Sequence, residues 1–206
     1  RSIPKILHVA RNKSFYRIEN NKLQYLLATG KYENLKREEG TRRFSEEKRT
    51  KKPLFSNKVA SYFEINDDIG MVEFHSKANA LDGESMKLLS DAINHSEINH
   101  RGMVIHNDAS HFSCGVNLER IADFIEVCDW DGLDAFLEHF QKTVKKMKYS
   151  SIPVISAPSG LSIGGGFEVV LHTDASIYHA NSVTGLVESL VGVVPGGGGV
   201  KEILYR

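Results

Sequence analysis

The feature that most constrains this chain is the way its charges divide along the sequence. The 206 residues are neutral overall, with 26 Lys and Arg against 26 Asp and Glu. Residues 1–58 hold 16 basic and 6 acidic residues, a net charge of +10, and residues 59–206 hold the other 10 basic and 20 acidic residues, a net charge of −10. These opposed charges predict two parts with different properties, with a boundary near Lys58.

The basic part has few periodic apolar positions, and the stretch 31–53 is mostly charged. Such a segment is expected to bury too little apolar surface to offset the entropy of ordering. Two short apolar groups, 15–18 and 23–27, flank a polar connection and predict a hairpin. Phosphate contacts need only Lys and Arg, but no aromatic residues are interleaved with the charges and no base-reading motif is present. We interpret residues 1–57 as a solvated linker that binds no nucleic acid.

Composition excludes several classes of protein. With 41% hydrophobic residues the chain is not globally disordered. No apolar run reaches the roughly 18 to 20 residues that cross a bilayer, and the N-terminus lacks a signal-peptide pattern, so we expect no membrane span. Two cysteines, Cys114 and Cys128, are too few for a disulfide framework, and no ligand spacing typical of a metal site accompanies them. We therefore expect a cytoplasmic protein with no metal.

From residue 60 onward, apolar blocks alternate with turns, as in a compact α/β domain. Strands are predicted at 61–65 and 71–74, joined as a hairpin through 66–70, with buried strands at 102–106 and 152–157. Asp82 is placed to cap a helix that runs through Ile93. A broken helical stripe over 121–144 is expected to divide into two helices at 130–132.

Two glycine runs mark the C-terminal third of the chain. Gly164, Gly165 and Gly166 follow an apolar strand and precede a helix-like stretch, and a second run, 196–199, follows Pro195. Consecutive glycines indicate close backbone approach or unusual dihedral angles. Amides at a helix N-terminus suit a developing negative oxygen, although a tight packing turn explains the first run equally well. Neither run has the spacing of a phosphate-binding or dinucleotide-binding loop.

Two glutamates accompany the glycines. Glu168 lies in the first helical turn after 164–166, and Glu188 follows 20 residues later among apolar residues. A carboxylate in apolar surroundings has a raised pKa and can transfer a proton near neutral pH. Each glutamate alone is more often a salt-bridge or capping residue. Because 20 extended residues span about 66–72 Å, the spacing does not show that the two acids meet.

The order of these motifs resembles the crotonase superfamily, specifically the enoyl-CoA hydratases. The matching pieces are NALD at 79–82, FSCGVNL at 112–118, IPVI at 152–155, GGGFE at 164–168, GLVE at 185–188 and VVPGGGG at 193–199. The resemblance covers about residues 58–206 and implies an α/β fold, a crotonase-like spiral of ββα units. It also implies an oxyanion hole formed by the backbone amides of Val116 and Gly165, with Glu168 activating water and Glu188 protonating the substrate Cα.

The resemblance further implies where coenzyme A, as part of an enoyl-CoA substrate, is held. The positions that match are Lys77, Ala78, Ala80, Cys114 and Val116. A lysine suits phosphates as a point charge, although an ordinary surface lysine is an equally good interpretation of Lys77. No separate cofactor is expected.

A basic segment before such a domain also resembles the bacterial fusion in which a 3-hydroxyacyl-CoA dehydrogenase precedes a hydratase. Residues 1–57 are then a linker or the tail of the dehydrogenase domain. Stand-alone relatives continue past the position of Arg206 into helices that close the acyl pocket and support trimer packing. We therefore expect 58–206 to be a C-terminally truncated core and the full domain to form a trimer-type homo-oligomer.

Three functions remain open from the sequence. The first is an enoyl-CoA hydratase of fatty acid β-oxidation, and the second is a Δ3,Δ2-enoyl-CoA isomerase. The third is a catalytically silent, truncated CoA-binding fragment. Hydration needs a base for water and an acid for Cα, and isomerases of the superfamily often keep only one of these acids. The presence of both Glu168 and Glu188 favours the hydratase.

Overall fold

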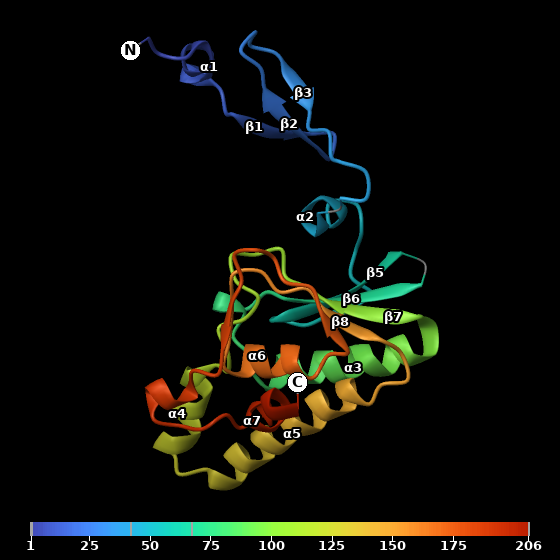
Figure 1. Cartoon of the computed structure of the whole chain (residues 1–206), viewed down its shortest axis with the longest axis vertical. Helices are drawn as coiled ribbons and strands as arrows, with labels where there is room; N and C mark the ends of the chain where they lie inside the picture. The colour runs from blue at the N-terminus through green and yellow to red at the C-terminus, as the bar shows by residue number, and fades with distance from the viewer. Residues whose placement is uncertain (1, 42, 67, 206) are drawn as a thin grey trace. The chain divides into compact units, whose positions relative to one another are not determined.

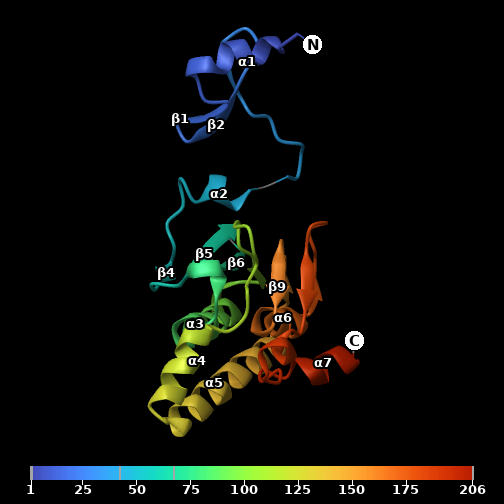
Figure 2. The same ribbon diagram turned by 90° about the vertical axis from the view of Figure 1, so that its left-hand side faces the viewer.

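The computed structural model describes residues 2–41, 43–66 and 68–205 and divides the chain into two compact units, Arg1–Lys52 and Pro53–Arg206. Figures 1 and 2 show both units in two orientations. Asp67, in the predicted connection 66–70, lies outside the described residues. Whether the first unit is a linker or the tail of a dehydrogenase domain stays a prediction.

The first unit contains a small antiparallel sheet with the order β1-β2-β3. The predicted hairpin is confirmed, since Tyr16 in β1 pairs with Tyr25 in β2 and the chain turns at Asn20 and Asn21, both with positive φ, as asparagine tolerates. The elements are α1 (Lys5–Val9), η1 (Ala10–Asn12), β1 (Tyr16–Glu19), β2 (Lys22–Leu26), β3 (Tyr32–Asn34) and α2 (Phe44–Glu47).

The first unit is more ordered than its composition predicts. Leu26 and Phe44 are buried, and the Arg17 guanidinium lies 4.0 Å from the centre of the Tyr32 ring. Arginine stacks on aromatic faces and covers apolar surface with its stem, so a basic segment can build a small core without many aliphatic residues. The segment therefore holds a third strand and short helices beside the predicted hairpin, with most of its described residues exposed or half-buried.

The second unit is built on a six-stranded sheet with the order β10-β8-β7-β6-β5-β4. Strands β4, β5 and β6 pair antiparallel, as the hairpin prediction requires, whereas β6, β7, β8 and β10 are parallel neighbours. A second, two-stranded parallel sheet pairs β9 with β11. The strands are β4 (Phe55–Ser56), β5 (Ala60–Asn66), β6 (Ile69–Phe74), β7 (Gly102–Ile105), β8 (Val154–Ser156), β9 (Leu161–Ile163), β10 (Ala175–Ser176) and β11 (Val183–Gly185).

Helices α3 (Gly83–Asn99) and α5 (Trp130–Lys148) pack against each other below the six-stranded sheet in Figure 1. The predicted cap of α3 is confirmed, because Asp82 accepts a hydrogen bond from the Ser85 amide and the Ser85 hydroxyl accepts one from the Asp82 amide. Fully buried side chains from the sheet and both helices form one core, among them Tyr62, Phe74, Leu89, Ile93 and Phe140.

The long helical stripe divides earlier than the sequence predicts. Helix α4 (Leu118–Glu126) ends before Cys128, which has a φ of +54°, and α5 begins at Trp130. The Asp129 side chain accepts a hydrogen bond from the Gly132 amide and caps α5. Gly132 thus lies in the first helical turn instead of between helices, because the Asp129 cap satisfies its amide.

The predicted ββα arrangement is confirmed by the order of elements. Strands β5 and β6 precede α3, and β8 and β9 precede α6 (Gly165–Leu171). Strands β10 and β11 precede the short η3 (Glu188–Val191) and α7 (Gly199–Tyr205), and η2 (Lys77–Asn79) precedes α3. The two glutamates singled out in the sequence lie in the first turns of the elements that follow β9 and β11, Glu168 in α6 and Glu188 in η3.

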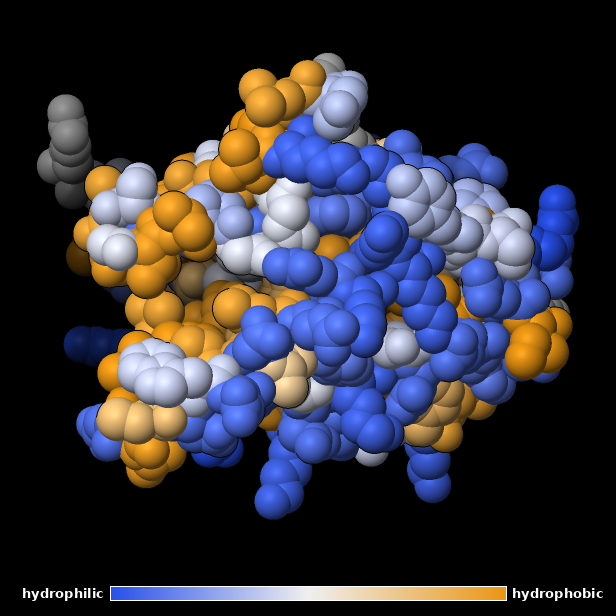
Figure 3. Space-filling view, turned by 90° about the horizontal axis from the view of Figure 1, so that it is seen from below, coloured by the Kyte–Doolittle hydropathy of each residue, from blue (hydrophilic) through white to orange (hydrophobic). Residues whose placement is uncertain are grey.

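One face of the molecule has a mixed surface. Figure 3 shows this face from below, with apolar residues gathered on the left and hydrophilic residues over most of the rest. Over the described part of the chain as a whole, exposed apolar side chains include Leu190, Val191, Val194, Leu204 and Tyr205. Among the described residues no helix combines the length and apolar character needed to cross a bilayer. The cytoplasmic location and the trimer-type assembly stay predictions.

Candidate active site

The first glycine run is held against a second segment by strand β9. The amides of Phe112 and Ser113 donate hydrogen bonds to the Leu161 carbonyl, and the Ile163 amide donates one to the Ser113 carbonyl. This pairing places residues 113–116 beside 163–165 although the two segments lie about 50 positions apart in the sequence. It is the contact on which the predicted oxyanion hole depends.

Glycine is required where these two segments meet. Gly115 has a φ of +95°, and a Cβ built there would lie 3.1 Å from the Ile163 carbonyl oxygen and 3.5 Å from the Gly165 nitrogen. A Cβ on Gly165 would lie 3.4 Å from the Val116 nitrogen and 2.9 Å from its Cγ2. The glycines thus allow a close approach that side chains would prevent.

This approach brings the backbone amides of Val116 and Gly165 close together. No hydrogen-bond acceptor for either amide is found within the described part of the chain. Gly165 is the first residue of α6, where an amide has no partner inside the helix. The structure is therefore compatible with both interpretations of the glycine run: it is a tight packing turn, and it leaves two neighbouring donors free for a negatively charged oxygen.

Glu168 is buried at the start of α6, with 2% of the residue exposed. Its Oε1 accepts hydrogen bonds from the amides of Gly197, at 2.8 Å, and Gly199, at 2.9 Å. Burial raises the pKa of Glu168 and the negative charge of Glu188 raises it further, while the two amide hydrogen bonds oppose the increase. A carboxyl group in this environment can accept or release a proton closer to neutral pH than an exposed glutamate.

Glu188 lies at the start of η3, and it is half-buried. A Cβ built on Gly164 would lie 3.3 Å from Glu188 Oε1, so this acid reaches the glycine turn that precedes Glu168. Its Oε2 is buried and has no hydrogen-bond partner among the described residues. A buried oxygen without a partner is costly, which is typical of an atom that meets a ligand or a proton. The fold thus brings together two acids that their spacing alone could not place.

The residues predicted to hold coenzyme A form a second group beside the Val116 amide. Cys114 donates its amide to the Ala78 carbonyl, and Leu81, next to Ala80, donates its amide to the Gly115 carbonyl. Ala78 has a φ of +55°, a left-handed conformation that only the surrounding contacts can hold. Lys77 is exposed, and burial raises the pKa of the Cys114 thiol, which is therefore not an activated nucleophile.

Sequence reasoning missed the second glycine run as part of the site. Gly197 and Gly199 supply the amides that bind Glu168, and His172 donates a hydrogen bond from Nδ1 to the Glu168 carbonyl at 2.7 Å. The only sequence signal is positional, because His172 follows Glu168 by four residues, one helical turn.

A hollow of about 600 Å³ lies along α3 and β4, where Leu88 and His95 contribute to its lining. None of the predicted site residues lines it, and Glu168 and Glu188 lie elsewhere. We therefore assign the candidate site to the glycine turns.

A comparison with protein-family models identifies the family of the domain that contains these residues. Residues 64–206 match the family model described as enoyl-CoA hydratase/isomerase. The chain belongs to this family. The match covers both glycine runs, both glutamates and the segment around Val116, so the crotonase resemblance of the motifs is confirmed at the level of the family.

Curated relatives of this family member are much longer proteins. A Bacillus subtilis protein named a probable 3-hydroxyacyl-CoA dehydrogenase is 35% identical over 192 residues, which cover 93% of this chain and 24% of the relative. A Rickettsia felis protein named as a trifunctional enzyme of a fatty acid oxidation complex is 32% identical over 131 residues, which cover 64% of this chain and 18% of the relative. The chain thus spans a quarter or less of these relatives.

Among solved structures, an enoyl-CoA hydratase from Polaromonas superposes with a TM-score of 0.67 at 24% identity. The match covers 71% of this chain and 58% of that one. At this identity the likeness shows the fold alone, and it confirms the predicted crotonase-type α/β architecture of the family member.

Proposed function

We propose that this domain is an enoyl-CoA hydratase that adds water to trans-2-enoyl-CoA thioesters in fatty acid oxidation. The observation that supports this best is the meeting of two acids, Glu168 and Glu188, at the glycine turn 164–166. The free amide of Gly165 belongs to this turn, and that of Val116 lies beside it. Membership of the hydratase/isomerase family and the names of the longer relatives support the same reaction class.

In the proposed mechanism the two carboxyl groups differ in their roles. Glu168 takes a proton from water as the water oxygen attacks Cβ of the enoyl thioester, and Glu188 delivers a proton to Cα. Proton transfer by a positioned carboxyl group typically accelerates a reaction by roughly 10²- to 10⁴-fold, and the pKa of Glu168, raised by burial, suits a base that works near neutral pH.

The amides of Val116 and Gly165 are proposed to bind the thioester oxygen. Attack at Cβ moves negative charge onto this oxygen as an enolate forms, and two preorganised donors stabilise that charge. Loss of one such donor typically costs roughly 10²- to 10³-fold in rate. Because the donors belong to the backbone, the side chain at 116 does not have to be small for this role.

Coenzyme A is proposed to lie along Lys77, Ala78, Ala80 and Cys114, which adjoin the Val116 amide. Lys77 then meets a phosphate as an exposed point charge. An exposed ion pair of this kind contributes up to about 1 kcal/mol, so Lys77→Ala is expected to raise KM about two- to five-fold and leave kcat unchanged. Lys87→Ala, on the exposed face of α3, serves as the control, and an equal change in both variants would remove Lys77 from the site.

The proposed reaction is tested by following the absorbance of the conjugated enoyl thioester after the protein is added. We expect this absorbance to fall with the wild-type chain, and Glu168→Gln and Glu188→Gln to slow the fall by roughly 10²- to 10⁴-fold. Glu138→Gln, a change on an exposed part of α5, is the matched control and should leave the rate unchanged. Full activity in both site variants would contradict the assigned residues.

The same preparation separates the hydratase from its alternatives. Turnover of a 3-enoyl-CoA with little hydration of the 2-enoyl-CoA would identify an isomerase. Binding of CoA in calorimetry without turnover of either substrate would identify a silent binding fragment.

A further inference from the structure

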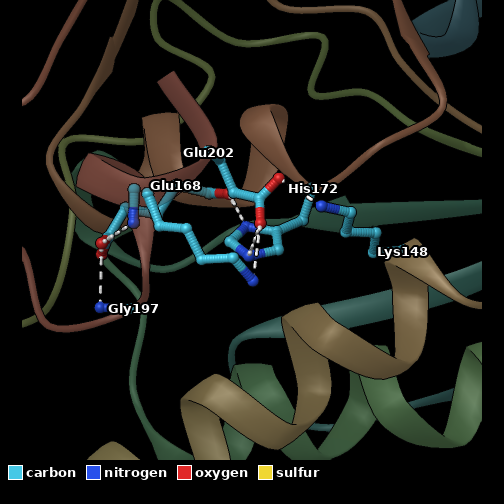
Figure 4. A network of polar contacts seen from close by, with 7 residues as sticks. Lys148, Glu168, His172, Gly197 and Glu202 are labelled. Atoms are coloured by element: carbon cyan, nitrogen blue, oxygen red, sulfur yellow. Dashed lines mark hydrogen bonds and ion pairs between the residues drawn. The ribbon is translucent and has the colours of Figure 1, made fainter. Parts of the chain in front are cut away.

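An ionic network centred on the buried Glu202 lies next to the candidate site and has no part in the proposed mechanism. Glu202, in the first turn of α7, is 3% exposed. Its Oε2 lies 2.5 Å from Lys148 Nζ, and its Oε1 lies 3.8 Å from both His172 Nε2 and Lys201 Nζ. Figure 4 shows Glu202 with Lys148 and His172 on one side of the network and Glu168 with Gly197 on the other.

The network joins three helices. Lys148 ends α5, His172 caps the C-terminal end of α6, and Glu202 belongs to α7. Burial opposes the ionisation of Glu202, but the hydrogen bond from Lys148 and the charges of Lys148 and Lys201 outweigh it and hold the pKa of Glu202 below its usual value. A buried carboxylate with such partners fixes the position of its helix, since it cannot move away without becoming an unpaired charge.

This helix and the loop that precedes it carry the amides that hold Glu168. Gly199 is the first residue of α7, and the Glu202 amide donates a hydrogen bond to the Gly198 carbonyl. A Cβ built on Gly198 would lie 3.6 Å from His172 Nε2, so the imidazole packs directly against the glycine run. His172 also donates from Nδ1 to the Glu168 carbonyl. The same side chain therefore contacts the backbone of Glu168 and the loop that binds its carboxylate.

We propose that Glu202, with Lys148 and His172, is a positioning group: it holds the amides of Gly197 and Gly199 on the Glu168 carboxylate and thereby fixes the orientation of that carboxylate. Its effect on turnover rests on the proposed hydratase function, whereas its effect on Glu168 itself does not. A purely structural role of Glu202 would stabilise α7 without changing the environment of Glu168.

The direction in which the pKa of Glu168 changes when Glu202 is replaced distinguishes the positioning role from the purely structural role. Glu188 on η3 is the charged group that acts on Glu168 directly, and His172 contacts the Glu168 backbone. Lys148 on α5, His172 after α6 and Lys201 on α7 surround Glu202. Replacing Glu202 by glutamine removes a negative charge, which by itself lowers the pKa of Glu168. Loss of the two amide hydrogen bonds has the opposite effect, because these bonds favour the ionised carboxylate. An upward change in Glu202→Gln therefore reports displacement of the amides.

The experiment is a carboxyl ¹³C NMR titration of the full chain with labelled glutamate, in which Glu168→Gln assigns the Glu168 signal. We expect the Glu168 titration to move to higher pH in Glu202→Gln. We expect no upward movement in the charge-matched control Glu138→Gln, which breaks an exposed pair with Lys142 on α5. In the enoyl-CoA assay, Glu202→Gln should lower kcat by roughly 10- to 100-fold with little change in KM, as expected for a small misplacement of a reacting group.

If Glu202→Gln does not fold, the double variant Glu202→Met/Lys148→Met replaces the ion pair by apolar side chains and keeps the net charge. A Glu168 titration that is unchanged or moves to lower pH in a folded variant, with only a lowered Tm, would overturn the proposal. A titration that moves upward in a protein that hydrates no enoyl-CoA would support the positioning role and contradict the proposed function.

Discussion

The two glycine runs have nearly the same composition but different physical roles. At 164–166 the glycines let two backbones approach, and the Val116 and Gly165 amides remain free. At 196–199 the amides are already used, because Gly197 and Gly199 donate to the Glu168 carboxylate. A Cβ on Gly197 would lie 2.6 Å from Glu168 Oε2. The first run thus leaves donors free for a negatively charged oxygen, and the second holds the carboxylate of Glu168, the proposed base.

The largest effect expected from this difference is that of Gly115→Ala, which disturbs the first run. The φ of +95° and the 3.1 Å approach to the Ile163 carbonyl leave no room for a methyl group without movement of the backbone. Displacement of the Val116 amide should lower kcat by roughly 10²- to 10³-fold, measured in the enoyl-thioester assay.

Gly83→Ala is the control for this change, because a Cβ at Gly83 meets nothing within 4 Å. Its kcat should match the wild type. If Gly115→Ala kept full activity while remaining folded, the free amide of Val116 beside the first run would have no role in turnover.

The second expected effect is that of Gly197→Ala on the Glu168 carboxylate. The added methyl group would lie 2.5 Å from Phe140 Cε1 and 2.6 Å from Glu168 Oε2. We expect overpacking to cost about 1–3 kcal/mol in the free energy of unfolding and a displaced carboxylate to lower kcat by about 10²-fold. Denaturant titration and the enoyl-thioester assay measure the two effects, and a stability loss with normal kcat would show that the second run only packs.

The smallest expected effect is on the pH dependence of protein stability, through His172 beside the second glycine run. Burial lowers the pKa of His172 below its ordinary 6.5, so the unfolded chain binds a proton that the folded chain does not. The stability that depends on neutral His172 is complete above about pH 6.5 and is lost as the pH falls through the lower pKa of the folded state. Glu168 acts in the opposite direction, since its raised pKa favours the folded state when it is protonated.

We therefore compare the wild type with His172→Gln in thermal unfolding between pH 7 and pH 5. The wild type should lose about 2–4 °C more in Tm over this range than the variant, the change that ~1 kcal/mol produces in a protein of this size. Equal pH dependence in the two proteins would mean that His172 is not neutral and buried at the second run.

Much of the second unit could be predicted from local patterns. The β5–β6 hairpin, the Asp82 cap and the glycine turn before α6 depend on neighbouring residues, which a sequence displays directly. The sequence places the break between α4 and α5 too late, at 130–132. In the structure the Asp129 cap outweighs the helix-breaking tendency of Gly132, and α5 begins at Trp130. In the first unit, the packing of Arg17 on Tyr32 gave order to a segment whose composition predicts little.

For the site, the sequence identified candidate residues but not the contacts that bring them together. Glu168, Glu188 and the segment around Val116 could be named from motifs, but their meeting depends on the pairing of β9 with residues 112–113 and with β11. The bond from Gly197 to Glu168 joins residues 29 positions apart, and that from Lys148 to Glu202 joins residues 54 apart. Contacts over such separations are set by the tertiary fold, which local spacing does not specify.

The most direct test of the central claim, that the two glycine runs build one hydration site, is turnover of a trans-2-enoyl-CoA in ¹⁸O-labelled heavy water. We predict a 3-hydroxyacyl-CoA product that carries ¹⁸O at Cβ and one solvent deuterium at Cα, and roughly 10²- to 10⁴-fold less of this product with Glu168→Gln or Glu188→Gln. Deuterium in the recovered enoyl-CoA or its double-bond isomer, without ¹⁸O at Cβ, would contradict the account.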